Sequence, residues 1–307
     1  MENKLKHFAE SIFTKHGTRM YRKEKDAFLE HCKQEFAQLG YDDVIVKEDK
    51  NMFGGTSRNL VVGPLDADIL VTAHYDTPGR NGFLLLLSPL VGSLGANLVF
   101  MFIIMLASVF ANVDPWVSYA TTVFFWVLMI SFFVKNKNNY NDNTSGVLGV
   151  YKVAELVSSN PELKARCAFI LFDHEEIFPG LLGSKAFAKW RTKNHPDKAN
   201  GVVINMDCIG IGEVLSVMTK KKHDKFNNIA EFMQQEGFAV EKARGGLAGN
   251  SDHASFTNGV SLLYKKRSLL GPTYIPKIHT NRDTVCNLEQ VEHLCGAIYR
   301  YIDKPSA

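Results

Sequence analysis

The chain is poor in the features that mark small secreted proteins and nucleic-acid-binding proteins. Its 307 residues include only five cysteines, an odd number without paired spacing, so no disulfide framework is indicated and a reducing compartment is favoured. The net charge is only +3 and the basic residues are scattered, which gives no strong case for nucleic-acid binding. The first residues, MENKLKHFAESIF, lack the apolar core of a signal peptide.

Charge is almost absent from residues 83–134, where Asp114 is the single charged side chain. The run divides at residues 112–115, and the stretch that follows, residues 116–134, would span about 28 Å as an α-helix, close to the roughly 30 Å of a bilayer core. A buried helical pair or an apolar dimerisation flap is the alternative, but such helices rarely stay apolar on all sides over this length. The pattern therefore predicts a two-helix transmembrane hairpin at residues 83–134.

The charges beside this insertion predict its orientation. Arg80 precedes it and Lys135 and Lys137 follow it, and positive flanks favour the cytoplasm. We therefore expect a two-pass integral membrane protein with both termini and the catalytic domain in the cytoplasm, and with the lipid bilayer as the partner of the hairpin. Other basic groups, such as Lys220–Lys222, are interpreted as solvated surface, with contact to anionic lipid headgroups as the alternative.

Residues 1–82 and 135–307 are expected to form one discontinuous domain, and their apolar runs indicate an α/β fold. Three of these runs are Ile69–Ala73, Ala168–Phe172 and Val202–Met206, and each stops at or shortly before a polar side chain that can bind a metal. In an α/β sheet the carboxyl ends of the strands gather such side chains at one edge. The short tethers between these side chains and the insertion predict that it walls the cleft and that the substrate is apolar.

Metal-ligand side chains stand in five short motifs, VTAHYDTPG, NDNTSG, FDHEEIFPGLLGS, VINMDCIGIG and KIHTNRDT. The candidates are His74, Asp142, the pair Glu175 and Glu176, Asp207, and His279. Singly they could be a structural histidine, a helix N-cap or a solvated turn, but together these explanations require five coincidences. Two imidazoles and three carboxylates suit two zinc-like ions that share one carboxylate, and the remaining glutamate suits a general base.

In this order the motifs resemble the M28 family of co-catalytic di-zinc aminopeptidases, over the whole chain except the insertion. The resemblance implies a mixed central sheet with helices on both faces and two divalent metal ions, zinc above all. It implies that His74 and Glu176 hold one ion, and that Asp207 and His279 hold the other. Asp142 would bridge the two ions, and the resemblance implies a cis peptide bond after it.

The resemblance also implies the roles of two further carboxylates. Glu175 would act as the general base, and Asp76 would orient the ring of His74. The motif Ser251-Asp252-His253 is similar to a family motif near the substrate, but a structural role for this loop is preferred over direct contact. A structural role is also preferred for Asp283, beside the loop of His279.

Together these features predict a membrane-anchored metallopeptidase that hydrolyses peptide bonds as an aminopeptidase, with water activated at two metals and Glu175 as the base. One alternative is an amidase or carboxypeptidase acting on N-acylated or lipid-like substrates. A cyclotransferase of the glutaminyl-cyclase kind shares the fold but usually uses one working metal. A non-catalytic membrane assembly subunit is disfavoured, because every expected ligand is present.

Overall fold

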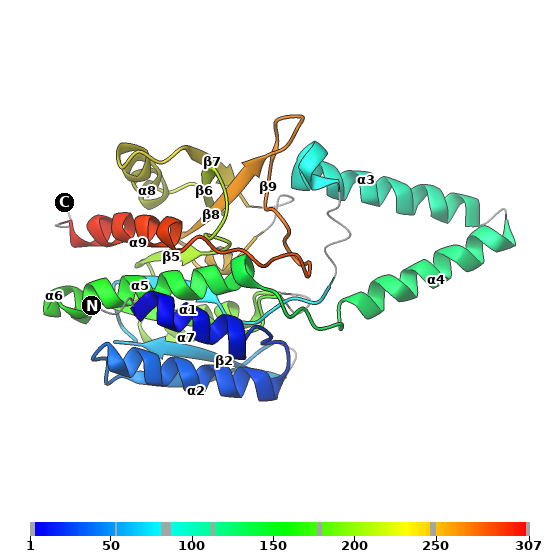
Figure 1. Cartoon of the computed structure of the whole chain (residues 1–307). Helices are drawn as coiled ribbons and strands as arrows, with labels where there is room; N and C mark the ends of the chain where they lie inside the picture. The colour runs from blue at the N-terminus through cyan, green and yellow to red at the C-terminus, as the bar shows by residue number, and fades with distance from the viewer. Residues whose placement is uncertain are drawn as a thin grey trace.

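A mixed β-sheet runs through the middle of the protein, with helices on both faces (Figure 1). The computed structural model describes residues 4–52, 54–80, 87–111, 114–176, 180–245 and 250–304. In this part of the chain the strands are β1 (Val44–Lys50), β2 (Thr56–Val62), β3 (Ile69–His74), β4 (Cys167–Phe172), β5 (Val202–Met206), β6 (Val214–Thr219), β7 (Val240–Arg244), β8 (Gly259–Arg267) and β9 (Thr273–Tyr274). Their order across the sheet is β1-β2-β4-β3-β5-β8-β6-β7, and β9 pairs with β8.

The centre of this sheet is parallel. Strands β4, β3, β5 and β8 run side by side in one direction, and β2 and β6 join this block antiparallel. In the register of β3 and β4, His74 at the end of one strand lies opposite Phe172 at the end of the other. The carboxyl ends of the parallel strands therefore meet at one edge, where polar residues that follow them come together. The predicted α/β fold with a mixed sheet is confirmed.

Helices cover the two faces of the sheet because alternate residues of its buried strands point to opposite sides. The helices of the body are α1 (Lys4–Lys15), α2 (Arg22–Gln38), α5 (Gly146–Ser158), α6 (Pro161–Arg166), α7 (Leu182–Asn194), α8 (Asp224–Gln235) and α9 (Leu288–Asp303), with the short turns η2 (Tyr140–Ser145), η3 (Pro196–Lys198) and η4 (Asp252–Ser255). Val71 of β3 packs into the larger core, which includes α1, α2, α5, α8 and α9. Its neighbour Leu70 packs into a smaller core with Phe187 of α7.

Two further helices, α3 (Ser88–Ala111) and α4 (Pro115–Ser131), leave this body as an open hairpin on the side away from both termini (Figure 1). The carboxylate of Asp114 caps α4, because it accepts the N–H of Trp116 at 2.7 Å and of Val117 at 3.3 Å. Backbone bonds join the start of α3 to the loop before β9, and Gly79 pairs with Lys135 where the chain leaves and re-enters the body.

The transmembrane prediction for residues 83–134 is wrong. No helix in the described ranges has both the length and the sustained apolar character that crossing a membrane requires. Helix α4 ends at Ser131 and has 17 residues, about 26 Å, where the sequence suggested an unbroken run to Val134. Residues 83–86 and 112–113 of the predicted hairpin lie outside the described residues. This finding also removes the basis of three related predictions, which are the two-pass membrane location, the cytoplasmic orientation and the bilayer as a partner.

Candidate metal centre

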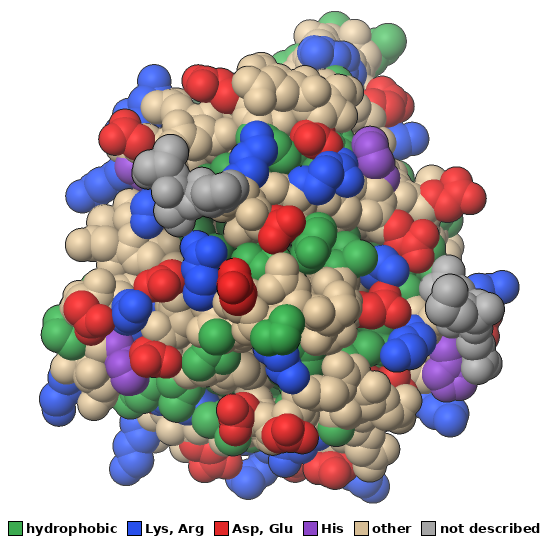
Figure 2. Space-filling model, turned by 90° about the vertical axis from the view of Figure 1, so that its left-hand side faces the viewer, with side chains coloured by type: hydrophobic (Ala, Val, Ile, Leu, Met, Phe, Trp, Pro, Cys, Tyr) green, Lys and Arg blue, Asp and Glu red, His purple; other side chains and the backbone are tan. Residues whose placement is uncertain are grey.

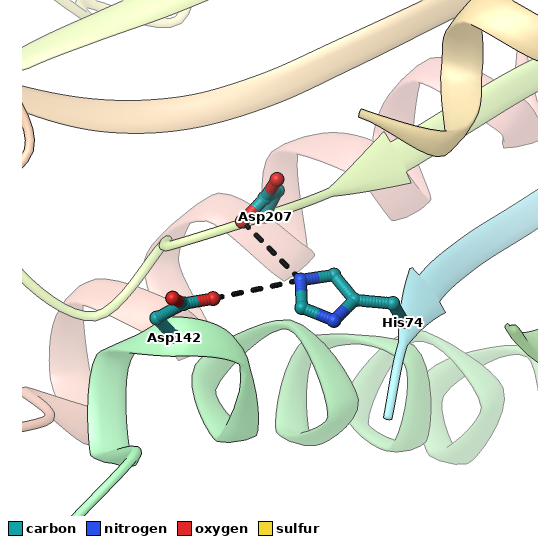
Figure 3. A group of neighbouring side chains, drawn as sticks. All are labelled: His74, Asp142 and Asp207. Atoms are coloured by element: carbon teal, nitrogen blue, oxygen red, sulfur yellow. Dashed lines mark ion pairs between the residues drawn. The ribbon is translucent and has the colours of Figure 1, made fainter. Parts of the chain in front are cut away.

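The carboxyl edge of the parallel strands brings the predicted ligands together. His74 is the last residue of β3 and is almost fully buried, and Asp207 directly follows β5, the neighbouring strand. Glu175 and Glu176 come shortly after β4, on the other side of β3. Figure 3 shows His74, Asp142 and Asp207 pointing toward one another from three different elements. The adjacent and parallel strands β4, β3 and β5 account for the convergence of His74, Asp207 and the glutamate pair.

Asp142 reaches the same place from the turn η2 at the start of α5. The carboxylate of Asp283 holds this turn, since it accepts the N–H of Asn141 at 3.0 Å and of Asp142 at 2.9 Å. The side chain of Asn143 bonds to Met206 and Cys208, on either side of Asp207, at 3.1 Å each. The peptide bond between Asp142 and Asn143 is cis, as the family resemblance implied. The backbone of η2 is thus tied directly to the end of β5.

The two carboxylate oxygens of Asp142 face different imidazoles. Oδ1 lies 3.5 Å from Nε2 of His74, and Oδ2 lies 3.2 Å from Nε2 of His279. On one side, Asp207 Oδ1 lies 3.8 Å from the same nitrogen of His74. On the other side, Glu176 Oε1 lies 3.3 Å from the same nitrogen of His279. Asp142 therefore stands between two histidine–carboxylate pairs.

Ligand atoms within 4.8 Å of one another form three overlapping groups among the described residues. The groups are His74–Asp142–Asp207, Asp142–Glu176–His279 and His74–Glu175–Glu176. The first two share Asp142 and together contain all five predicted ligands. They pair His74 with Asp207 and Glu176 with His279, whereas the resemblance was taken to pair His74 with Glu176 and Asp207 with His279. The third group also places His74 beside Glu176, so the pairing stays a prediction, and the distances around Asp142 support the new one.

The side chains in these groups fit a divalent cation. Imidazole nitrogen and carboxylate oxygen are the donors that zinc takes in proteins. Asp142 is buried, and its Oδ2 has no hydrogen-bond partner in the described part of the chain. A buried carboxylate oxygen without such a partner calls for a compensating charge, and a cation between Asp142 and His279 would supply it.

The electrostatics of the centre are strongly perturbed, as is typical of functional sites. Burial disfavours the charged form of Asp142, but the close approach of the rings of His279 and His74 outweighs it and holds the pKa of Asp142 well below its usual range. Burial also disfavours protonation of His74 and His279, but the surrounding carboxylates raise the pKa of both rings. Burial, followed by the charges of Glu176 and Asp207, raises the pKa of Glu175, although His74 opposes this.

Asp76 contacts both the turn that carries Glu175 and Glu176 and the ring of His74. Its carboxylate accepts the N–H of Glu175 at 3.0 Å and of Glu176 at 3.1 Å, so it holds the turn that carries the glutamate pair. Nδ1 of His74, the nitrogen turned away from Asp142, lies 3.2 Å from the backbone oxygen of Asp76 and 3.6 Å from its carboxylate. The predicted orienting role of Asp76 stays a prediction, and its contact with the glutamate turn was not foreseen.

Three non-glycine residues at this edge have left-handed backbone conformations. They are His174, Cys208 and His279, with φ angles of 58°, 54° and 57°. His174 precedes the glutamate pair, Cys208 follows Asp207, and His279 is itself a predicted ligand. Such strain persists only where the surrounding structure holds it, and it often occurs at functional sites.

The loop with Ser251, Asp252 and His253 lies against the same edge of the sheet, and all three side chains are buried. Neither oxygen of Asp252 and neither ring nitrogen of His253 has a hydrogen-bond partner among the described residues. Burial raises the pKa of Asp252 to about 7, although the charge of His74 opposes this. Whether this loop contacts substrate or only supports the fold stays a prediction.

Sequence reasoning missed two buried cations behind the centre, Arg19 and Lys25. Lys25 pairs with Asp173 at 2.5 Å, and its charge is the largest of the influences that lower the pKa of Asp76 against the effect of burial. A signal was present in the sequence, because Lys25 continues the helical spacing of the buried residues Phe28 and Cys32. A lysine at such a core position needs a buried partner.

Comparisons with known proteins identify the class that this fold and site define. The chain belongs to peptidase family M28, because the model of that family matches residues 131–295, more than half of the chain. No curated protein matches the chain significantly.

Solved structures similar to this chain include aminopeptidases and a cyclase. The LapA aminopeptidase of Legionella pneumophila has 18% identity, coverage of 98% of this chain and 71% of that one, and a TM-score of 0.63. A Zn-dependent exopeptidase of Parabacteroides distasonis has 16% identity, coverage of 97% of this chain and 98% of that one, and a TM-score of 0.63. The glutaminyl cyclase of Porphyromonas gingivalis has 16% identity, coverage of 96% of this chain and 97% of that one, and a TM-score of 0.62. At these identities the structures show a shared fold, which both enzyme types use.

Proposed function

We propose that this protein is a zinc-dependent hydrolase that removes N-terminal residues from peptides. The observation that carries the proposal is the position of Asp142, with one carboxylate oxygen toward each of two imidazoles. A carboxylate placed in this way suits a shared ligand of two cations. Membership of peptidase family M28 supports peptide bonds as the target.

The proposed ligands follow the geometry of the two groups. His74, Asp142 and Asp207 would hold one ion, and Asp142, Glu176 and His279 would hold the other. Zinc in such a site supplies a Lewis acid for the scissile carbonyl and lowers the pKa of water from about 15.7 to roughly 7. Asp76 fixes the backbone from which Glu176 reaches the second group.

Glu175 is the proposed general base. Its side chain lies with His74 and Glu176 in the third group but belongs to neither proposed ion site, so its carboxylate is free to move a proton. Asp76 holds its backbone N–H, which limits how far the side chain can drift from the reacting atoms. Glu175 would take a proton from the attacking water and return it to the departing amine.

A cyclotransferase is the second candidate, because a glutaminyl cyclase matches the fold over nearly the whole of both chains. Two complete ligand groups favour the hydrolase, since the cyclases of this fold usually use one working metal. An amidase that accepts N-acylated substrates remains the alternative within hydrolysis. Substrates with free, acylated and glutaminyl amino termini separate the three activities.

The test uses the zinc-reconstituted 307-residue chain and three matched substrates, an aminoacyl anilide, its N-acetyl form and a glutaminyl peptide. We expect turnover of the free-amino substrate, two zinc ions per chain, and a loss of about 10²–10⁴-fold in kcat for Glu175→Gln with its zinc content unchanged. Preference for the N-acetyl substrate would replace the aminopeptidase with an amidase. Cyclisation of the glutaminyl peptide without hydrolysis would establish the cyclotransferase instead.

A further inference from the structure

Arg19 is the largest side chain that is fully buried in the described residues, and it lies directly behind the metal centre. It belongs to the linker between α1 and α2, outside the segment that matches the family model. A fully buried arginine is rare, because its charge must leave water. Its contacts therefore indicate what it does.

The guanidinium of Arg19 donates in three directions. Nε donates to the backbone oxygen of Tyr75 at 2.5 Å, Nη2 donates to the hydroxyl of Thr144 at 3.0 Å, and Nη1 donates to the oxygen of His16 at 2.7 Å. The backbone of Arg19 makes two hydrogen bonds with Thr77. The N–H of Arg19 donates to the hydroxyl of Thr77 at 3.0 Å, and the N–H of Thr77 donates to the backbone oxygen of Arg19 at 3.3 Å. The planar group is thus held from several sides.

These contacts join the two segments that supply the first ion group. Tyr75 stands between His74 and Asp76 in the sequence, and Thr144 follows Asp142 by two residues. One rigid guanidinium therefore spans the end of β3 and the turn η2. The distance between the two backbones sets the distance between Nε2 of His74 and Oδ1 of Asp142, which is 3.5 Å.

The charge of Arg19 also suits this position. No carboxylate of the described residues lies within ion-pair distance of the guanidinium, and its three acceptors are neutral. Burial lowers its pKa to about 10, and the nearby Asp76 and Asp142 oppose this shift, so it stays charged at neutral pH. A neutral residue would be less costly to bury if only packing were required. The carboxylates of the centre favour a cation here.

We propose that Arg19 is a positioning residue of the metal centre, which sets the spacing of His74 and Asp142 by clamping the backbone at Tyr75 and the side chain of Thr144. This inference rests on the proposed function only in that the centre binds metal. It does not depend on which peptide or amide the enzyme cleaves.

The experiment compares metal binding in variants of the full chain. Arg19→Gln removes the charge and the fork of donors, and Thr144→Val removes one acceptor while keeping the volume of the side chain. Thr144→Ser keeps the hydroxyl and should restore wild-type behaviour. Arg191→Gln is the matched control, because Arg191 is also buried and also donates to three backbone oxygens, those of Leu65, Ala67 and Lys198. Residues 65 and 67 lie before β3, at the end opposite to His74.

Zinc affinity is measured by competition with a chelator, and ligand geometry by the visible absorption of the cobalt(II) form. We expect Arg19→Gln to raise the zinc dissociation constant about 10–100-fold, the range for groups that orient ligands, and to change the cobalt spectrum. Thr144→Val should show a smaller change in the same direction. Arg191→Gln should lower thermal stability but leave both metal readouts as in the wild type.

Wild-type affinity in Arg19→Gln, or equal weakening in Arg191→Gln, would overturn the proposal. If Arg19→Gln does not fold, Thr144→Val decides, and unchanged zinc affinity in that variant would also overturn it. A wild-type chain that binds neither zinc nor cobalt would remove both this inference and the proposed function. A chain that binds zinc but cleaves none of the three substrates would remove only the proposed function.

Discussion

The metal centre and the α3–α4 hairpin place their side chains in opposite ways. In the centre the carboxylates of Asp76 and Asp283 are buried and accept directed hydrogen bonds, and Asp142 is buried beside them. In the hairpin, large apolar side chains are exposed, with Trp116 at 81% and Met101 at 66%. On the face turned away from the hairpin, side chains of both charges are interspersed (Figure 2).

The difference shows which kind of information each region needs. The backbone hydrogen bonds of the hairpin helices join residues close together in the sequence. The centre needs a turn, two strand ends and a linker in place before its charges can be buried. An exposed apolar surface of this extent is typical of a contact surface, and no described part of the chain covers the side chains that are exposed there.

The largest expected effect comes from exchanging one carboxylate for an amide in each region. Asp142→Asn should reduce zinc to less than one ion per chain, because both ion groups lose a charged oxygen. Activity should fall by more than the roughly 100-fold that follows when a residue that only orients a metal ligand is replaced. Asp114→Asn is the control in the hairpin, since asparagine caps a helix as well as aspartate does. Zinc content by atomic absorption separates the two, and an equal loss in both variants would contradict the assignment of Asp142.

A smaller effect is expected on stability when an aromatic side chain is truncated in each region. Phe36 of α2 is fully buried, so Phe36→Ala should lower the free energy of unfolding by about 3–5 kcal/mol. Phe125 of α4 is 54% exposed, and Phe125→Ala should change it by no more than about 0.5 kcal/mol. Denaturant unfolding measures both. A large loss for Phe125→Ala would mean that the hairpin is covered in solution, which would sharpen the comparison.

The smallest effect is a pH dependence of stability from the interface of α1 and α2. Burial, followed by the charges of His31, Arg19 and Lys15, lowers the pKa of His16 from 6.5 to about 4. Between these values the unfolded chain binds a proton that the folded chain excludes, so this contribution destabilises the fold as pH falls through that window and is absent above it.

The measurement is the thermal midpoint of the wild type and of His16→Phe near neutral pH and near pH 5. We expect the thermal midpoint to decrease less between neutral pH and pH 5 in the variant than in the wild type, because the phenyl ring keeps the stacking on His31 without titrating. Identical decreases in the two proteins would show that His16 does not contribute.

Much of the body could be read from the sequence because its elements carry their own patterns. The strands β3, β4 and β5 are short apolar runs, and α9 shows helical spacing of residues such as Leu294 and Ile298. Strand β7, with the sequence VEKAR, was not foreseen, because its partner β6 rather than its own composition makes it a strand.

The candidate site divides in the same way. The types and order of the candidate ligands were visible, because each stands in a short motif beside a strand or helix end. Their pairing was not, since it depends on which oxygen of Asp142 faces which imidazole. The partners of Arg19 and Lys25 could not be read from the sequence either, because their hydrogen bonds go to residues far along the chain.

The sequence by itself determined the α/β class, the family and the set of residues able to bind metal, because these depend on local periodicity and on side-chain chemistry. Only the tertiary structure decided the grouping of the ligands, the burial of the cations behind them and the extent of the hairpin helices. Those properties depend on distances between segments remote in the sequence, and on where a helix ends, which an apolar run does not specify.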